Sequence, residues 1–245
     1  MAIFGLVHGA NCGSWCWRLL VPELERRGHV CRLVDLPTDD VSAGWDDHIA
    51  ATLDAFPDPE TIVVAHSRAG RMIPLLLQRQ RFRKVVLVSA SIPGGMTPPP
   101  YQSPSVPPRR VLDNLPPFQL DDLGRTVCTP ERARLTLFSG CSPEVLAWAL
   151  PLLRPQHELP VPDPVHWPIA DVEYVVPEDD RAVDPAWMRM AARERLGVEP
   201  IDVPGDHSPF LSRPGPLADV LHRLASEPAT STPIPGRERR DSILP

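Results

Sequence analysis

Lysine is almost missing from this chain, and long apolar runs are missing altogether. Its 25 basic residues are arginines except for Lys84, and 31 acidic residues outnumber them, which gives a net charge of −6. An acidic chain of this kind is not expected to bind nucleic acid or an anionic membrane surface. No run approaches the roughly 18 apolar residues of a membrane-spanning helix. The sequence therefore predicts neither a nucleic-acid partner nor a membrane association.

The five cysteines argue against both a disulfide framework and a metal site. An odd number without paired spacing does not fit a small domain held together by disulfides. Cys12 and Cys16 stand four residues apart, but no second Cys/His pair follows at zinc-finger spacing. The first residues, MAIFGLVHGA, form no charged leader and too short an apolar run for a signal peptide. We therefore expect no metal ion and a location in a reducing cytoplasm.

Short apolar strands alternate with helical segments along most of the chain. Strands are expected at residues 2–7, 29–35, 61–65, 84–89, 171–177 and 199–203, and helices at 15–27, 44–56, 68–79, 185–195 and 214–225. This alternation predicts an α/β fold: a doubly wound, mostly parallel sheet of about six strands flanked by helices. Residues 1–90 and 168–226 would form this core, and the polar, proline-rich tail at 227–245 is predicted to be disordered.

Residues 91–167 interrupt the alternation and are predicted to form a cap inserted between two core strands. Residues 93–117 are too rich in proline for regular structure. Two helices are expected after them, because Thr129-Pro130 and Ser142-Pro143 each place an N-cap residue before a proline suited to the first helical position. The second of these helices, roughly residues 143–153, is strongly apolar.

The run TIVVAHSRAG contains the predicted nucleophile, Ser67, between an apolar strand-like stretch and an apolar helix-like stretch. A tight strand-to-helix turn lifts a serine hydroxyl out of the sheet and puts the next N–H at a helix N-terminus, where it can hold an oxyanion. The turn needs small residues two positions before and after the serine, and Ala65 and Ala69 stand where the usual pattern has glycine. The alternative is a serine that merely caps a helix.

A histidine and an acid complete the predicted site. His207, in the turn PGDHSPF, follows a strand at the sheet edge where active sites of open α/β sheets lie, and it is the predicted general base. The run PEDDRAVDP supplies the acid. Asp184 precedes a proline and a helix, so N-capping explains it. We favour Asp180 as the acid that orients the histidine, with Asp179 as the alternative, while Glu178 and Asp179 could both be solvated loop charges.

Two backbone amides are predicted to hold the oxyanion of the reaction. The loop HGAN after the first strand is the expected place for one donor, the Ala10 N–H, and Arg68 N–H would be the other. His8 and His66 are interpreted as structural histidines rather than bases.

Asn11 and Trp148 are the candidates for the substrate pocket, although Trp148 could equally fill the core of the cap. Trp15 and Trp17 are interpreted as packing residues.

Five segments, in order, resemble one family: LVHGANCGSWCWRLLVPELERRGHVCRLVDLP, VVAHSRAG, TPERARLTLFSGCSPEVLAWALPLLRPQ, EDDRAVDP and PGDHSPFLSRP. They are similar to compact α/β-hydrolases, in the branch of plant methylesterases, the related hydroxynitrile lyases and their bacterial esterase relatives. The resemblance covers roughly residues 2–225. It implies a nucleophile at Ser67, an acid at Asp180, a base at His207 and oxyanion amides at Ala10 and Arg68. It also implies no cofactor and often a homodimer.

Two positions separate this chain from the lyases that it resembles. The lyases carry a threonine where this chain has Gly9, and a lysine after the catalytic histidine where it has Ser208; both departures favour ester hydrolysis. We therefore predict an enzyme, a serine esterase that cleaves a small or medium, mostly apolar carboxylic ester through an acyl-enzyme on Ser67. The alternatives are a lyase, cyclase or acyltransferase of the same fold that acts on a specialised metabolite with His207 as base, and a non-catalytic receptor for a small molecule.

Overall fold

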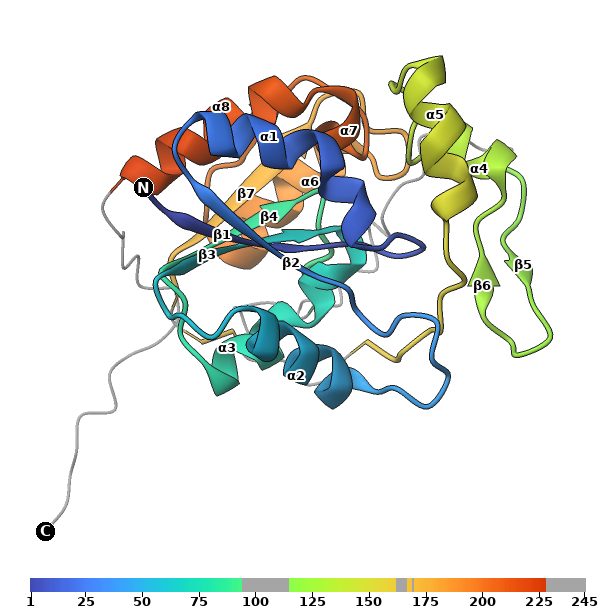
Figure 1. Ribbon diagram of the computed structural model, residues 1–245, viewed down its shortest axis with the longest axis horizontal. Helices are drawn as coiled ribbons and strands as arrows, with labels where there is room; N and C mark the ends of the chain where they lie inside the picture. Colours follow the sequence, from blue (N-terminus) through green and yellow to red (C-terminus); the bar gives the residue numbers. More distant parts are fainter. Residues whose placement is uncertain (94–114, 162–166, 169, 228–245) are drawn as a thin grey trace, which may run out of the picture.

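A single parallel sheet forms the centre of the molecule (Figure 1). In this computed structural model, the described residues are 1–93, 115–161, 167–168 and 170–227. The sheet has six strands in the order β2-β1-β3-β4-β7-β8. The strands are β1 (Ile3–Val7), β2 (Val30–Val34), β3 (Thr61–His66), β4 (Lys84–Val88), β7 (Val172–Pro177) and β8 (Ile201–Val203). The predicted α/β class, a doubly wound parallel sheet, is confirmed.

Helices cover both faces of the sheet, because side chains of the central strands alternate between two apolar clusters. Along β3, Val63 and Ala65 belong to one cluster and Ile62 and Val64 to the other. The first cluster packs against α2 (Trp45–Ala55), α3 (Ile73–Arg79) and α6 (Pro185–Ala191). The second packs against α1 (Leu20–Arg26), α7 (Pro209–Ser212) and α8 (Pro214–Ser226). Figure 1 shows α1 and α8 on one side of the sheet and α2 and α3 on the other.

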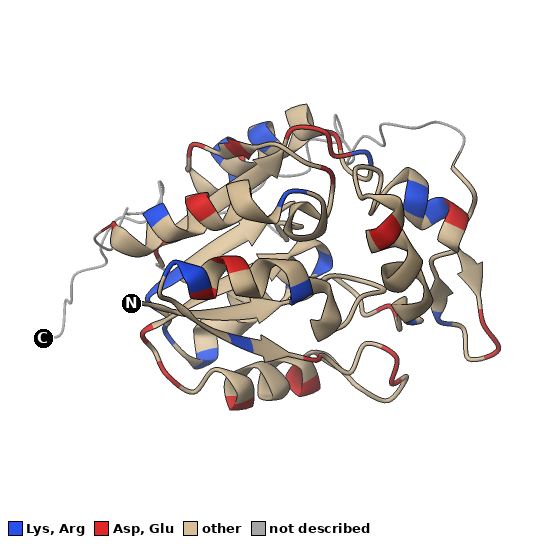
Figure 2. Cartoon of the chain, turned by 45° about the horizontal axis from the view of Figure 1, so that its top comes forward, with Lys and Arg blue, Asp and Glu red and all other residues tan. Residues whose placement is uncertain are grey.

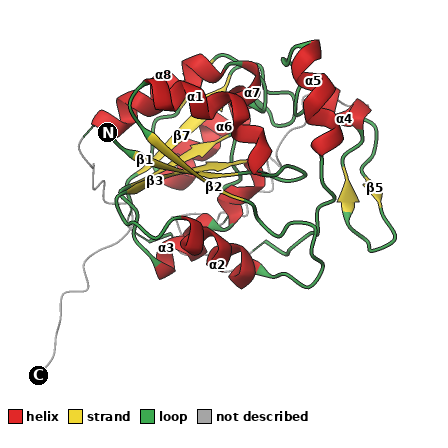
Figure 3. Cartoon of the chain, viewed as in Figure 1, coloured by secondary structure: helices red, strands yellow, loops and turns green. Residues whose placement is uncertain are grey.

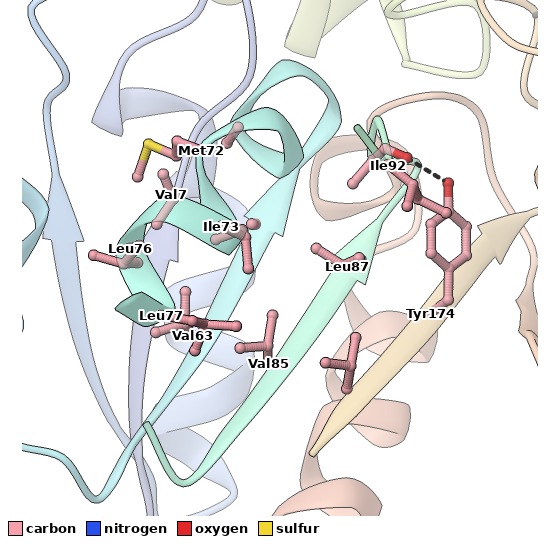
Figure 4. Close-up of a cluster of buried hydrophobic side chains, with 14 of the residues drawn as sticks. Val7, Val63, Met72, Ile73, Leu76, Leu77, Val85, Leu87, Ile92 and Tyr174 are labelled. Atoms are coloured by element: carbon pink, nitrogen blue, oxygen red, sulfur yellow. Dashed lines mark hydrogen bonds between the residues drawn. The ribbon is translucent and has the colours of Figure 1, made fainter. Parts of the chain in front are cut away.

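Figure 4 shows the first of these clusters between α3 and the sheet. The labelled side chains come from the helix side (Met72, Ile73, Leu76, Leu77), from four strands (Val7, Val63, Val85, Leu87, Tyr174) and from the loop after β4 (Ile92). Full burial of each aliphatic side chain stabilises the fold by about 1.5–3 kcal/mol. The hydroxyl of Tyr174 donates a hydrogen bond of 2.7 Å to the carbonyl of Ala90, which fixes the loop after β4 to β7.

The connections reverse direction at the centre of the sheet. The chain passes from β1 through α1 to β2 on one side of β1, and returns through α2 to β3 on the other side. The carboxyl ends of β1 and β3 therefore lie side by side at a topological switch point, where ligands of open α/β sheets bind. The loop that begins at His8 and the turn at Ser67 extend from these two ends.

A separate group of short elements lies beyond the carboxyl edge of the sheet (Figure 3). It contains a two-stranded antiparallel sheet, β5 (Gln119–Leu120) with β6 (Thr126–Val127), and the helices α4 (Pro130–Leu135) and α5 (Pro143–Ala149). Thr129 and Ser142 cap the two helices, since their hydroxyls accept hydrogen bonds from the N–H groups of Arg132 and Val145. Both predicted helix starts are thus confirmed. We call residues 115–161 the cap segment.

Most predicted elements match the structure within two residues, but three helices are interrupted. Single helices were expected at 15–27, 68–79 and 185–195. They are divided into the 3₁₀ turns η1 (Ser14–Leu19) and η2 (Ser67–Arg71) ahead of α1 and α3, and a π-helical turn η4 (Ala192–Leu196) after α6. The 3₁₀ turn η3 (Leu150–Leu152) extends α5, and α7 and the β5–β6 pair were not expected. Most of the proline-rich run 93–117 and of the tail 227–245 lies outside the described residues.

Acidic and basic residues are interspersed along the chain (Figure 2). Ion pairs between elements include Arg79 with Asp46 at 2.9 Å and Arg189 with Asp202 at 2.8 Å. No helix among the described residues is long and apolar enough to cross a membrane.

Candidate active site

Ser67 occupies a strained turn directly after β3. Its φ is +51°, a left-handed conformation that non-glycine residues seldom adopt outside sites where the surrounding structure imposes it. His66 is the last residue of β3 and Ser67 the first of η2. The side chain of Ser67 is partly exposed, whereas Ala65 and Ala69 are buried. Alanine is therefore small enough at both positions for the turn to form.

The loop after β4 contacts the backbone of the serine turn. The carbonyl of Ser67 accepts a hydrogen bond of 2.9 Å from the N–H of Ser91. This contact requires close approach at Gly70, since a Cβ there would lie 2.2 Å from the carbonyl oxygen of Ser91 and 3.0 Å from the Cβ of Ala90. The glycine that the turn needs thus stands one residue after the expected position at Ala69.

The structure brings Ser67, His207 and Asp180 into one hydrogen-bonded chain. The Nδ1 of His207 lies 2.7 Å from Asp180 Oδ2, and its Nε2 lies 3.0 Å from Ser67 Oγ. A carboxylate can only accept, so Nδ1 carries the proton and Nε2 is left to accept from the serine hydroxyl. The residues come from the turn after β3, from the loop after β7 and from the loop after β8, and they meet at the carboxyl edge of the sheet.

Asp180, and not Asp179, is the acid that contacts the histidine. Asp180 is 2% exposed, and its Oδ1 accepts hydrogen bonds from the N–H groups of Ala182 and Val183 at 2.8 and 2.9 Å. Asp179 is exposed, and its N–H donates to the carbonyl of Gly205. These two hydrogen bonds hold Oδ1 of Asp180 in place, so that Oδ2 faces His207. The nearby Asp184 caps α6, as expected, by accepting from the N–H of Ala186 at 2.8 Å.

The electrostatics of the site favour a histidine that can take up a proton. Burial by itself lowers the pKa of His207, but the charge and hydrogen bond of Asp180 and the charge of Asp206 raise it more, so its pKa lies above the ordinary value. Burial holds the pKa of the neighbouring His66 well below its ordinary value, so this ring stays neutral. The two histidines, whose ring centroids lie 4.9 Å apart, therefore do not compete for the proton.

The structural assignments of His8 and His66 agree with their contacts. His8 is fully buried; its Nε2 accepts from the N–H of Leu36 at 3.0 Å, and its Nδ1 donates to the carbonyl of Gly9 at 2.9 Å. His66 donates from Nε2 to the carbonyl of His207 at 2.9 Å. Each ring thus fixes the backbone of a loop in the site, one around Gly9 and the other around His207.

The predicted oxyanion donors lie in the loops at the switch point. Ala10 follows Gly9, and Arg68 follows Ser67; the backbone N–H groups of Ala10 and Arg68 are not used in hydrogen bonds between described residues. The two loops are in close contact, since a Cβ at Gly9 would lie 2.9 Å from the Cβ of Ser67 and 2.7 Å from Nδ1 of His66. A larger residue at Gly9 would therefore push the serine turn away from this loop.

The side chain of Arg68 points away from the serine toward the end of the cap segment. It is 7% exposed, donates to the carbonyl of His157 at 3.2 Å and lies 3.6 Å from the carboxylate of Glu158. Its guanidinium also stacks 5.3 Å from the ring of Trp45. Burial lowers the pKa of Arg68, with Glu158 opposing the shift.

Asn11 has contacts that differ from those of a pocket residue. It is 3% exposed, has a positive φ of 58°, and donates from Nδ2 to the carbonyls of Thr126 and Arg154 at 3.1 and 3.0 Å. Its own carbonyl accepts from the N–H of Arg154. The side chain joins the oxyanion loop to the cap segment, so the pocket role that the sequence suggested for Asn11 is not what these contacts indicate.

Trp148 is half-buried on α5 and packs edge-on against Trp15 at 6.0 Å. The guanidinium of Arg18 lies 5.2 Å from the ring of Trp148. These contacts fix α5 to η1. The pocket role of Trp148 stays a prediction. Trp17, by contrast, is fully buried and packs against Phe210 at 4.4 Å, which agrees with its assignment as a packing residue.

Asp206 is a residue of the site that sequence reasoning missed. It directly precedes His207, is fully buried, and accepts hydrogen bonds from both its own loop and the cap segment. The turn letters PGDH made it look like an ordinary turn residue. The only available signal was an acid beside the histidine, which by itself does not indicate burial.

Comparison with known proteins identifies the family. The model of the alpha/beta hydrolase family matches residues 6–220, so the chain belongs to this family. Norfluorocurarine synthase 2 from Strychnos sp is 28% identical over 254 residues, which cover 91% of this chain and 95% of the relative. Methylesterase 1 from Arabidopsis thaliana is 25% identical over 258 residues, covering 91% and 96%. The resemblance to methylesterases that the sequence suggested is confirmed.

A solved structure shares the same fold over nearly the full length of both chains. The crystal structure of a pyrethroid hydrolase from Sphingobium faniae JZ-2 superposes with a TM-score of 0.70 and 22% sequence identity. The match covers 93% of this chain and 98% of the other. The likeness includes the region of the cap segment as well as the core sheet.

Proposed function

We propose that this protein is a serine carboxylesterase that cleaves a small or medium, mostly apolar carboxylic ester. The observation that carries the proposal is the chain of contacts from Asp180 through His207 to Ser67, with 2.7 and 3.0 Å between the hydrogen-bonding atoms. Similarity to a methylesterase supports the ester as the reacting group. The substrate is a small molecule, and the reaction needs no cofactor because each step uses a residue of the chain.

In the first half of the reaction, Ser67 Oγ attacks the carbonyl carbon of the ester while its proton passes to Nε2 of His207. The negative charge that develops on the carbonyl oxygen is held by the N–H groups of Ala10 and Arg68. His207 then gives the proton to the leaving alkoxide. The acyl group remains on Ser67 as an ester, and Asp180 stabilises the imidazolium that forms between the two transfers.

In the second half, water attacks the acyl-enzyme. His207 takes a proton from the water, the oxyanion forms again at Ala10 and Arg68, and collapse returns the proton to Ser67 Oγ. The products are a carboxylic acid and an alcohol. The raised pKa of His207 matters here, because activity requires the neutral imidazole and should increase as the pH rises through that pKa.

The test is hydrolysis of a panel of p-nitrophenyl and methyl esters by the wild type and by Ser67→Ala. We expect turnover in the wild type, a loss of at least about 10⁴-fold in the variant, and labelling of Ser67 by a fluorophosphonate. Ser91→Ala is the matched control, because it removes a nearby hydroxyl that does not contact His207. Full activity of Ser67→Ala would overturn the proposal.

A second candidate comes from the similarity to norfluorocurarine synthase 2, whose name denotes a synthase. A lyase, cyclase or acyltransferase reaction would use His207 as the base without release of an acid from an acyl-Ser67. Two positions favour hydrolysis over the lyase reaction. The lyases carry a threonine at the position of Gly9, where a side chain would crowd Ser67 and His66. They carry a lysine at the position of Ser208, which is fully buried here. A folded wild type that labels with the fluorophosphonate but turns over no ester would support this second candidate.

A further inference from the structure

Asp206 is a buried carboxylate with four donors around it. Its Oδ1 accepts from the N–H of Ser208 at 3.0 Å and from the hydroxyl of Ser212 at 2.7 Å. Its Oδ2 accepts from the N–H of Gly140 at 2.8 Å and lies 3.8 Å from the thiol of Cys141. The side chain is 0% exposed. These hydrogen bonds favour the charged form of Asp206, whereas its burial opposes that form.

The four donors belong to two parts of the molecule that are far apart in the sequence. Ser208 and Ser212 lie in the loop of His207 and the short helix α7 that follows it. Gly140 and Cys141 lie in the cap segment, between α4 and α5, and Gly140 is 66 residues from Asp206. Asp206 therefore joins the loop of the proposed base directly to the cap.

The fit between the two parts is close on the cap side. A Cβ at Gly140 would lie 3.4 Å from the Cβ of Asp206 and 3.5 Å from its carboxylate, so the backbone of the cap packs against this side chain. On the other side, the carbonyl of His207 is held by Nε2 of His66 at 2.9 Å. The backbone around His207 is thus held by His66 on one side and, through Asp206, by the cap segment on the other.

Few charged or titratable groups of the described residues act on His207 and Asp206. His207 faces the carboxylates of Asp180 and Asp206 and the neutral ring of His66. Asp206 faces His207 and the thiol of Cys141. Burial raises the pKa of Asp206, and the hydrogen bonds from Gly140, Ser212 and Ser208 oppose that rise. The negative charge of Asp206 adds to that of Asp180 in raising the pKa of His207.

We propose that Asp206 is a positioning residue of this esterase: its carboxylate locks the loop of His207 to residues 140–141 of the cap and adds negative charge beside the base. The inference rests on the proposed role of His207. It assigns Asp206 no contact with substrate. Its effect passes through the orientation of His207 and the ease with which that ring is protonated.

The variant Asp206→Asn tests both parts of the proposal, because it keeps the shape of the side chain and removes its charge. The N–H of Gly140 then meets either an NH₂ group or a neutral oxygen in place of the carboxylate. We expect kcat for a p-nitrophenyl ester to fall about 10-fold, as expected for a displaced base. The acid limb of the pH profile of kcat/KM should move to lower pH by about half a unit. The matched control is Asp179→Asn, since Asp179 is an exposed carboxylate next to Asp180. The acid limb of this control should stay in place.

Hydrogen exchange at residues 140–141 supplies a readout that does not require turnover. Asp206→Asn should speed exchange of the Gly140 N–H at least about 10-fold, because that N–H loses its charged acceptor. An unmoved acid limb together with unchanged exchange would overturn the inference. If Ser67→Ala retained activity, the proposed function would fail, and the exchange at Gly140 would still decide whether Asp206 joins the cap to the loop.

A second variant covers the case in which Asp206→Asn does not fold. Ser212→Ala removes one donor to Asp206 and keeps its charge. We expect kcat to fall about 3-fold with the acid limb at the wild-type pH. An unchanged kcat in Ser212→Ala would count against the positioning role.

Discussion

The two edges of the central sheet use polar residues in opposite ways. At the carboxyl edge, the chain leaves β1, β3 and β4 through Asn11, Ser67 and Ser89, whose φ values are 58°, 51° and 48°. These are the non-glycine residues with positive φ in the described part of the chain. Such conformations cost on the order of 1–3 kcal/mol each and persist where neighbouring contacts impose them. One of the three, Ser67, is the proposed nucleophile, and all three follow strands that end at the edge where the site lies.

At the amino edge, polar groups are buried in stabilising pairs instead. Lys84, at the start of β4, is 2% exposed and lies 3.1 Å from Asp171 and 3.4 Å from Glu173. His29, before β2, accepts from the N–H of Ala2 and hydrogen-bonds to His222 at 2.8 Å. We therefore expect substitutions at the amino edge to change stability more than turnover, and substitutions at the carboxyl edge to change turnover more than stability.

The largest expected effect is at the carboxyl edge. Asp180→Asn should lower kcat about 10⁴-fold, because an amide can no longer fix His207 in the tautomer that leaves Nε2 free to accept from Ser67. Stability should change little by comparison. Steady-state kinetics with a p-nitrophenyl ester measure the loss, and thermal unfolding checks the fold. A variant with activity within 10-fold of the wild type would mean that the edge does not hold its reactive geometry through Asp180.

Lys84→Met should show the reverse pattern at the amino edge. Removing the ammonium leaves the carboxylates of Asp171 and Glu173 close together, and we expect the free energy of unfolding to fall by about 3 kcal/mol. The turnover of folded protein should stay within about 2-fold of the wild type. Urea unfolding measures the first effect, and ester hydrolysis normalised to fluorophosphonate-labelled protein measures the second.

Arg79→Met is the control for that prediction, because Arg79 pairs with Asp46 at the surface, with side-chain exposures of 60% and 85%. It should change the free energy of unfolding by less than about 0.5 kcal/mol. A large loss of kcat in Lys84→Met would break the comparison, since the amino edge would then influence the reaction.

A pair of variants at Asn11 separates backbone strain from side-chain contacts. Asn11→Gly keeps the left-handed conformation but loses the hydrogen bonds to Thr126 and Arg154, and should lower the free energy of unfolding by about 1–2 kcal/mol. Asn11→Ala loses the same bonds and adds about 1 kcal/mol of strain, because alanine tolerates positive φ poorly. Urea unfolding of both variants gives the difference. Equal stabilities would show that φ at Asn11 carries little strain.

The smallest expected effect concerns pH, where histidines at the two edges should act with opposite sign. Burial lowers the pKa of His29, so the folded state loses stability as the pH falls below about 6.5, the unfolded value. The pKa of His207 is raised, so its contribution is present below about 6.5 and is lost as the pH rises through the folded pKa.

His29→Asn should therefore reduce the loss of stability between pH 7 and pH 5 by less than about 1 kcal/mol relative to the wild type. His207→Asn should increase that loss, because it removes a group that favours the folded state at acid pH. Urea midpoints measured at both pH values provide the comparison. Shifts of the same sign in the two variants would contradict the assignment of opposite pKa changes.

Much of the fold was predictable because its signals are local. Each core strand is a short apolar run followed by a turn, and the alternation with helices indicates a parallel sheet without knowledge of any contact. The proline positions after Thr129 and Ser142 predicted two helix starts for the same reason. The breaks inside three helices were not predictable, since 3₁₀ and π turns depend on how the helix ends pack.

The candidate site was predictable in part. Ser67 could be found because strand, serine and helix are adjacent in the sequence, and His207 because it follows a strand at the same edge. Asp180 was favoured over Asp179, but the sequence left both open, because neighbouring acids in a loop differ only in which one the turn buries. Asn11 was a candidate for the pocket, whereas its amide donates to carbonyls more than 100 residues away.

The sequence by itself determined the class of fold, the order of serine, acid and histidine, and the edge of the sheet at which they meet. These follow from the sequence of strand ends and from the rule that parallel strands end on the same side. The tertiary structure decided which acid contacts His207, that Gly70 rather than Ala69 needs to be glycine, and that Asp206 and Asn11 hold the cap. Those outcomes depend on contacts between distant segments, whose distances and directions exist only after the chain has packed.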